Sequence, residues 1–429
     1  MLFSIDEMLS AILGWVDDFV EDHSLPFFFD DRFDRVSQLL QLHSSLWLFL
    51  AGGMLLWAAR APDVRRRRAV TVAVLLLIGV IAMVFPLTPP LVTMGDSAQI
   101  AGSRRMFEEW VGFYGIRYEA HLSNAILGQI YRLGGESTDA PVHAEIVLAR
   151  AATVWFTICA LVVGAIERWS PMVVRYLALS LLAPATLMYF GWREVGYMSL
   201  NIATFPLLAR GLRTGDWRVE GGGALAGLGA AIHGLGLVSL IGGSLAALIT
   251  RARLTDRLIR FGRIAAWGTA AYTGWIAIYV IVLKLPIELG HAEDLLWRPW
   301  FADTALEGRM SAAIFSAAGA EEVFFTVWVT GLPLLAVAAS LWRAQRHDVR
   351  VMLAFAVPSI IFTIWSWPVL GIGRDADIVF AAFPALYAAA WVCAHDPKRT
   401  YIAAALLISA HYAFWRICLD PRFVHAALS

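Results

Sequence analysis

Charged residues are scarce in this chain. Asp, Glu, Lys and Arg make up 16% of its 429 residues, whereas 59% are hydrophobic. A soluble domain carries about 25% charged residues, and a soluble fold of this length could not hide so much apolar surface. We therefore expect lipid to solvate much of the chain.

Lysine and cysteine are also rare. Lys284 and Lys398 are the only lysines, and the formal net charge is zero, which argues against the basic footprint of a nucleic-acid-binding protein. The three cysteines, Cys159, Cys393 and Cys418, lie in or at the ends of apolar runs. They predict neither a disulfide framework nor a metal site. The sequence also lacks a Walker A motif, a Gly-x-Ser-x-Gly motif and a His-Glu-x-x-His motif.

The segment 1–43 is acidic and lacks the basic region that opens a standard signal peptide. Its apolar residues recur at helical spacing, which leaves two readings open, an amphipathic helix on the membrane surface and a solvated arm. We expect residues 44–429 to form a single transmembrane domain.

Apolar runs of roughly the length of a membrane span occur throughout that domain. They cover residues 44–59, 69–88, 145–166, 171–191, 195–211, 222–249, 262–283, 322–342, 351–370, 377–394 and 400–417. The expected fold class is therefore all-α, a polytopic transmembrane helical bundle of about 10–12 membrane segments.

Arginine-rich links orient this bundle, because short cytoplasmic links are enriched in Lys and Arg. The strongest is Arg65–Arg68, and others fall within 210–218, 251–263, 343–350 and 398–399. If all of these links are cytoplasmic, both ends of the run 222–249 are cytoplasmic too. This glycine-rich run is too short for two full spans. It predicts two short helices meeting near His233, a broken hairpin facing a cavity, unless the topology itself is wrong.

The same orientation gathers the longer polar segments on the outer face. These are the loop 89–144, the link 191–194, the loop 284–321 and the link 371–377. Long functional loops on one face suggest an active face that looks outward.

Asp96 is the main candidate on that face. It precedes a segment whose apolar residues Ile100, Met106, Phe107 and Trp110 fit an amphipathic helix. An Asp at this place can cap the helix N-terminus or act as a proton acceptor, and the two roles are compatible.

The segment Gly95–Phe107 resembles the first outer-loop signature of the GT-C glycosyltransferases, in the branch that includes aminoarabinose and protein-mannosyl transferases. That branch commonly has Asp-Glu-Ala, whereas Ser97 replaces the Glu here. Further segments are similar in order, at 119–133, 150–163 and 183–235, although the prolines common in the second outer helix are missing. The resemblance covers residues 85–250.

The resemblance implies transfer of a sugar from a polyprenyl-phosphate donor to an acceptor hydroxyl outside the cytoplasm. Asp96 would be the general base, and cationic groups would stabilise the phosphate leaving group. The candidates for binding donor phosphate or substrate are Arg104, Arg193, Glu194, His233, Lys284, Arg298, Arg309 and Arg374.

Several of these candidates also have a structural alternative. Arg193 could form a local ion pair with Glu194, and Arg374 could pair with Asp375 or Asp377. Arg104 and Arg105 could contact lipid headgroups. Lys284 could extend its ammonium group to the membrane surface, and His233 could form a buried hydrogen bond.

No cofactor is required by the sequence. His291, Glu293 and Asp294 could contact a divalent cation, but no ligand spacing demands one. The expected partners are the bilayer, the lipid-linked sugar donor and a glycan, lipid or protein acceptor, with no nucleic acid.

Two other functions stay open, a lipid-linked polysaccharide polymerase of the O-antigen type and a transporter or flippase of lipid-linked glycans. Transporters usually contain internal repeats, and no convincing repeat occurs here, which favours an enzyme. The expected location is a bacterial inner membrane, with the active site facing the periplasm.

Overall fold

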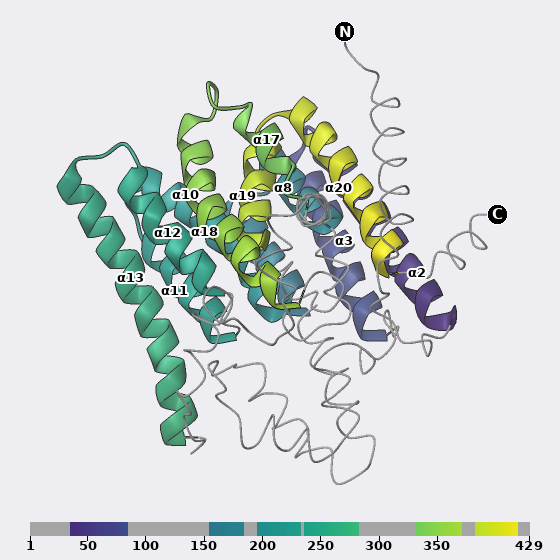
Figure 1. Ribbon diagram of the computed structural model, residues 1–429. Helices are drawn as coiled ribbons and strands as arrows, with labels where there is room; N and C mark the ends of the chain where they lie inside the picture. Colours follow the sequence, from purple (N-terminus) through teal and green to yellow (C-terminus); the bar gives the residue numbers. More distant parts are fainter. Residues whose placement is uncertain are drawn as a thin grey trace, which may run out of the picture.

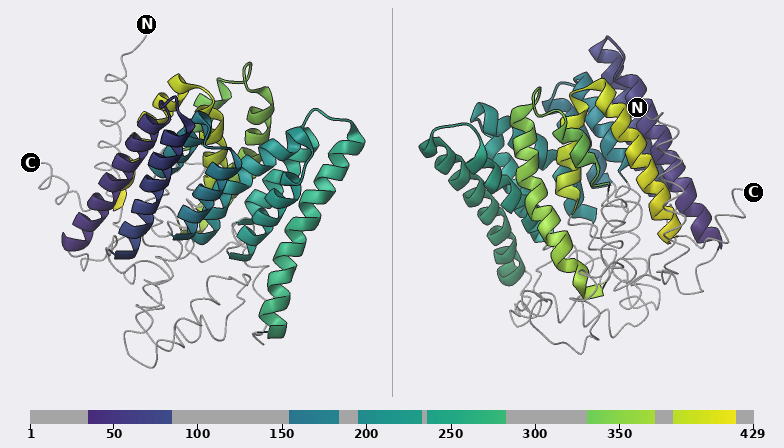
Figure 2. Two further views of the ribbon diagram at one scale, coloured as in Figure 1. Left: turned by 180° about the vertical axis from the view of Figure 1, so that it is seen from behind. Right: turned by 45° about the horizontal axis from the view of Figure 1, so that its top comes forward.

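The computed structural model describes residues 35–84, 154–183, 195–232, 236–282, 331–370 and 382–418. These ranges form helices joined by short turns, and they contain no strand. The helices lie side by side in a bundle (Figures 1 and 2). The prediction of an all-α fold is therefore confirmed for the part of the chain that is described.

The helices follow most of the apolar runs. They are α2 (Arg35–Ala58), α3 (Val64–Val84), α8 (Pro171–Leu182), α10 (Val195–Thr214), α11 (Arg218–Ile232), α12 (Leu237–Ile249), α13 (Leu254–Ala277) continued by the π-helix η4 (Ile278–Val282), α17 (Leu334–Ala339), α18 (Arg346–Leu370), α19 (Phe383–Ala394) and α20 (Pro397–Cys418). Residues 154–166 are also helical. Within the described ranges, no helix combines the length and the apolarity needed to cross a membrane.

The glycine-rich run 222–249 is divided as predicted. It contributes to α11 and α12, which have 15 and 13 residues. At 1.5 Å per residue each helix is about 20 Å long, shorter than the hydrocarbon core of a bilayer, about 30 Å. Gly236, at the start of α12, lies so close to the backbone of Gly229 that a Cβ atom there would overlap it. The start of α12 is thus packed tightly against α11.

The run 322–342 was expected to be one span, and its described part differs. Helix α17 ends at Ala339, and residues 340–344 form turns. The Ser340 hydroxyl donates to the carbonyl of Val337 over 2.6 Å, and Ala344 N donates to Leu341 O. A side chain that bonds nearby carbonyls competes with helix propagation, which hydropathy alone does not reveal.

Glycines let α11 and α13 approach backbone to backbone. A Cβ atom on Gly223 would lie 2.8 Å from the carbonyl oxygen of Ile264, and one on Gly227 would overlap the backbone of Gly268. Small residues at such crossings let helix axes come close, so that dispersion contacts hold the pair together.

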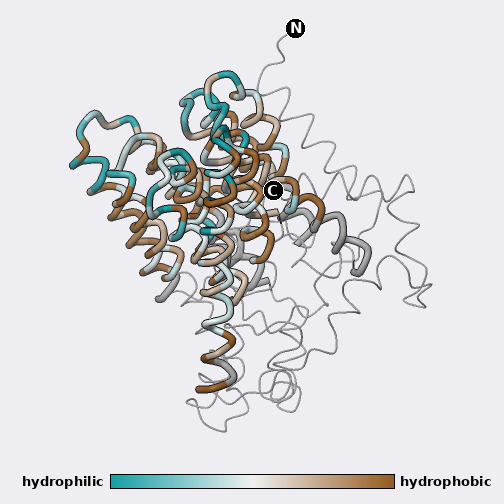
Figure 3. Tube along the Cα trace, turned by 90° about the vertical axis from the view of Figure 1, so that its left-hand side faces the viewer, coloured by the Kyte–Doolittle hydropathy of each residue, from teal (hydrophilic) through white to brown (hydrophobic). Residues whose placement is uncertain are grey.

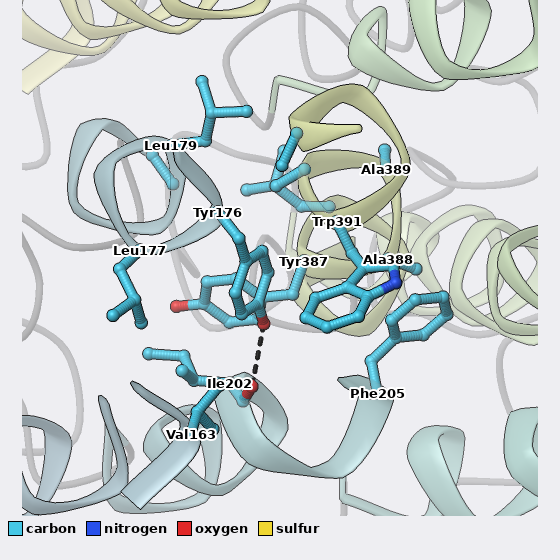
Figure 4. Close-up of a cluster of buried hydrophobic side chains, with 14 of the residues drawn as sticks. Val163, Tyr176, Leu177, Leu179, Ile202, Phe205, Tyr387, Ala388, Ala389 and Trp391 are labelled. Atoms are coloured by element: carbon cyan, nitrogen blue, oxygen red, sulfur yellow. Dashed lines mark hydrogen bonds between the residues drawn. The ribbon is translucent and has the colours of Figure 1, made fainter. Parts of the chain in front are cut away.

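Aromatic side chains fill the centre of the described core (Figure 4). Tyr176 and Trp391 meet edge to face with ring centroids 5.2 Å apart, and Phe205 contacts Phe355 in the same way. The Tyr176 hydroxyl donates to the carbonyl of Ile202 over 2.9 Å. A buried tyrosine needs such a partner, and this bond connects α8 to α10.

We predict that Gly227→Ala destabilises the protein by about 1–3 kcal/mol, the usual cost of overpacking, because the added methyl group meets backbone that cannot rotate away. Gly274→Ala is the matched control, since nothing lies within 4 Å of its Cβ position and alanine favours the helix by about 1 kcal/mol. Thermal unfolding of both variants measures the difference. Equal stability would contradict the close crossing.

Candidate functional site

The turns of the described bundle that carry arginine gather at one end, here called the arginine end. They lie at 59–63, 167–170, 250–253 and 340–345, together with the turns 215–217 and 395–396, whose adjoining helices carry Arg213, Arg218 and Arg399. Figure 3 shows the hydrophilic turns grouped together, with apolar stretches of helix extending away from them.

Hydrogen bonds between distant turns hold this end together. Arg60 Nε donates to the Tyr401 hydroxyl over 2.7 Å, which joins the α2–α3 turn to α20. Arg67 Nε donates to the carbonyl of Trp169 over 3.1 Å. Residues 102 and 341 positions apart in the sequence are thus direct neighbours.

Further bonds continue this network to the other turns. Arg210 Nη2 pairs with Glu167 Oε2 at 2.7 Å, and Arg263 Nη1 donates to the carbonyl of Gly215 over 3.0 Å. His347 Nε2 lies 3.0 Å from the carbonyl oxygen of Ala209. The arginine-rich links, expected from the sequence to share one side, are therefore together at one end of the bundle.

The opposite ends of the same helices form a second, separate end. Helices α3, α8, α11, α13 and α18 begin at the arginine end, so their last residues lie away from it, as the views in Figures 1 and 2 agree. These last residues are Val84, Leu182, Ile232, Val282 (of η4, which continues α13) and Leu370.

All nine residues predicted to act on substrate lie outside the described residues. They are Asp96, Arg104, Arg193, Glu194, His233, Lys284, Arg298, Arg309 and Arg374. The structure therefore brings none of these side chains together, and it separates none of them. Residues 1–34, most of the predicted acidic arm, and residues 291–294, with the carboxylates considered for a cation, also lie outside.

Several candidates nevertheless adjoin a described helix terminus at the second end. Ile232 is followed directly by His233, and Val195 is preceded directly by Glu194. Lys284 comes two residues after Val282. The described termini Val195, Ile232 and Val282 lie at the end opposite the arginines.

The best-defined polar cluster in the described residues surrounds Asp348, which sequence reasoning had not selected. Its Oδ2 atom accepts hydrogen bonds from Trp391 Nε1 over 3.2 Å and from His395 Nε2 over 2.8 Å. Oδ1 is buried without a hydrogen-bond partner, with His347 Nε2 at 4.0 Å. An isolated acid beside Arg346 in an otherwise basic link is the signal that could have identified it.

Opposing effects set the pKa of Asp348. Burial alone raises it, but the hydrogen bond from His395 and the positive charges of His395, His347 and Arg213 outweigh burial and lower the pKa. Asp348 also lies in the first turn of α18, where the helix dipole favours a negative charge. The carboxylate is therefore ionised and joins α18 to α19.

This cluster fits a structural role better than a catalytic one. The carboxylate is 2% exposed, so it offers little access to a substrate. No group of three metal-ligating side chains occurs among the described residues. The cluster fixes the arginine end to the core through Trp391.

No protein-family model, curated protein or solved structure matches the chain.

We predict that Asp348→Asn lowers the free energy of unfolding at neutral pH by about 2 kcal/mol, the usual value for hydrogen bonds to a charged group. Asp256→Asn, at an exposed position in the first turn of α13, should change it by less than about 0.5 kcal/mol. Denaturant unfolding measures both.

The same pair of proteins tests the sign of the pKa shift. A lowered pKa in the folded state stabilises the protein above the ordinary value of about 3.9. That contribution is lost as pH falls through the lower, folded-state pKa. The difference between the parent and Asp348→Asn should therefore be present at pH 5 and shrink below about pH 4. A difference that grows on acidification would refute an ionised carboxylate.

Proposed function

We propose that the protein is a membrane glycosyltransferase of the GT-C type. It transfers a sugar from a polyprenyl-phosphate donor to an acceptor hydroxyl on the non-cytoplasmic face, with Asp96 as the general base. The proposal starts from the resemblance of residues 85–250 to that superfamily.

The main structural support for the proposal is that the bundle has two different ends. Arginine-rich turns occupy one end, and the helix termini next to Glu194, His233 and Lys284 occupy the other. A membrane enzyme whose reaction takes place outside the cytoplasm requires this polarity, because arginine-rich links stay cytoplasmic.

Exposed apolar side chains on the helices support a lipid environment. They include Leu50, Met54 and Trp57 on α2, Leu76, Leu77 and Val80 on α3, Trp267 on α13, and Val357 and Ile361 on α18. Single exposed apolar residues are ordinary, but many on neighbouring helices indicate a surface that meets another apolar phase.

The proposed reaction is an inverting displacement. The acceptor hydroxyl oxygen bonds to the anomeric carbon while the bond from that carbon to the donor phosphate breaks. Asp96 takes the hydroxyl proton, and the electron pair leaves on the polyprenyl phosphate. Arg193, Arg374 or Lys284 would neutralise that phosphate, where an arginine can bind two oxygens at once and a lysine acts as a point charge.

One observation favours a second candidate, a transporter of lipid-linked glycans. The break between α11 and α12, with His233 in it, is the type of interrupted helix found at transporter binding sites. Both candidate functions use the same end of the bundle, so an activity assay has to distinguish the glycosyltransferase from the transporter.

We predict that the purified protein transfers sugar from a polyprenyl-phosphate donor to a cell-envelope acceptor, and that Asp96→Asn lowers the rate about 10²–10⁴-fold, as expected for loss of a general base. Asp256→Asn is the matched control at the arginine end and should retain the parental rate. Full activity in Asp96→Asn would overturn the assignment of the base. Glycan uptake into proteoliposomes without any transfer would support the transporter instead.

Cysteine labelling tests the orientation. In a variant without native cysteines, Glu194→Cys should react with a membrane-impermeant maleimide from outside intact cells. Asp256→Cys should react only after the cells are opened, because it lies at the arginine end. Labelling of both positions from the same side would contradict the proposed topology.

A further inference from the structure

Several arginines at the arginine end are neutralised or bonded by the protein itself. Arg210 pairs with Glu167, Arg218 with Asp216 and Arg263 with Glu220, while Arg67 and Arg175 donate to backbone carbonyls. These contacts involve no ligand, although Nε of Arg210 and Nε of Arg218 are buried without a hydrogen-bond partner.

Four other arginines lie close enough to interact and are here called the arginine patch: Arg251, Arg257, Arg346 and Arg350. No ion pair joins any of the four to a carboxylate of the described residues. Arg257 donates to the carbonyls of Ala252 and Leu248 at the end of α12. The patch therefore concentrates positive charge that the described protein leaves uncompensated.

Trp342 holds two of these arginines close together. The Arg346 Cζ atom lies 5.4 Å from the centroid of the Trp342 ring, and the Arg350 Cζ atom lies 5.5 Å from the same centroid. Helix α12, which leads into Arg251, packs along α18 and brings the turn at 250–253 to the same place. The indole is 37% exposed, so the patch opens to the surface.

The arginines of the patch affect one another. Loss of surrounding water and then the positive charges of Arg346, Arg251 and Arg257 lower the pKa of Arg350. Like charges at this separation destabilise one another until an anion lies between them. Guanidinium groups bind phosphate oxygens in a forked geometry, which makes phosphate a suitable anion.

The surface next to the patch is apolar and continues along the same helix. Arg346, Arg350, Leu353, Val357 and Ile361 follow each other at intervals of three or four residues, so they share one face of α18. The three apolar members are 40%, 50% and 57% exposed. From Arg350 to Ile361 this row is about 16 Å long, close to half of the hydrocarbon thickness of about 30 Å.

We propose that the arginine patch and Trp342 bind the phosphate of an anionic phospholipid, and that an acyl chain of the same lipid lies along Leu353, Val357 and Ile361. A free phosphate would use the patch but not the apolar row, which is why the row favours a lipid. This inference rests on the membrane location in the proposed function and is independent of the sugar chemistry.

The test compares lipids by thermal unfolding of the full-length protein in detergent micelles. Phosphatidylglycerol should raise the melting temperature of the parent protein more than phosphatidylcholine does. In Arg346→Gln/Arg350→Gln, the apparent affinity for phosphatidylglycerol should fall about thirtyfold, since each of the two arginines near an anionic headgroup contributes about fivefold.

Arg65→Gln/Arg68→Gln is the matched control. It removes the same charge from two exposed positions at the same end, and it should keep the parental affinity. Without anionic lipid and at low salt, the Arg346→Gln/Arg350→Gln protein should be at least as stable as the parent, because repulsion has been removed. That measurement also shows that the variant folds.

Equal affinities of the parent and Arg346→Gln/Arg350→Gln for phosphatidylglycerol would overturn the proposal. A shift with inorganic phosphate, together with equal shifts from the two lipids, would overturn the lipid assignment in favour of a free anion. Leu353→Ser/Val357→Ser should weaken binding of phosphatidylglycerol but not of inorganic phosphate, and an unchanged lipid affinity would contradict the acyl-chain contact.

Sugar transfer is measured separately. Normal transfer without lipid selectivity would count against this inference alone, whereas a protein absent from the membrane fraction would contradict both.

Discussion

The need to keep charged connections out of the apolar bundle organises the described structure. A guanidinium group without a partner loses several kcal/mol of hydration when it is buried. Each arginine-rich turn therefore has to stay at an end where water, a carboxylate or a backbone carbonyl can satisfy it. Because the helices are joined by short turns, fixing these turns at one end also fixes the direction of each helix. The opposite termini, such as Ile232 and Val282, are then at the other end.

Asp348 is the exception that connects this polar end to the core. It is a buried carboxylate, and it persists because Trp391 and His395 donate to the same oxygen. Trp391 also packs edge to face against Tyr176, whose hydroxyl is bound to α10. One side chain thus belongs to the polar network and to the aromatic centre. A buried pair such as Asp348 and His395 is weak evidence for added stability, but it fixes the contact between α18 and α19.

The proposed active end and the arginine patch both follow from the separation of the arginine-bearing turns from the opposite helix termini. At the end that adjoins Glu194, His233 and Lys284, polar residues follow directly on apolar helices, as a reaction centre at a membrane surface requires. At the arginine end Arg210, Arg218 and Arg263 are paired inside the protein, whereas the patch around Trp342 is the proposed site for an external anion. The glycine contacts of α11 and α13 hold a short, interrupted hairpin between the two ends, so both surfaces are carried by the same closely packed helices.

Sequence reasoning located most of the described helices and divided the run 222–249 correctly, because apolar content and arginine position are local properties of the chain. It extended the run 322–342 into a full span, since the bond from Ser340 to Val337 leaves no mark in hydropathy. It selected nine site residues from a resemblance, and all of them lie outside the described residues, so they stay predictions. It missed Asp348, whose partner His395 is 47 positions away. The sequence by itself determined where helices form and which links carry charge, because those depend on neighbours along the chain. The tertiary structure decided which arginines are paired and which are left as a patch, because that depends on contacts between residues that only packing brings together.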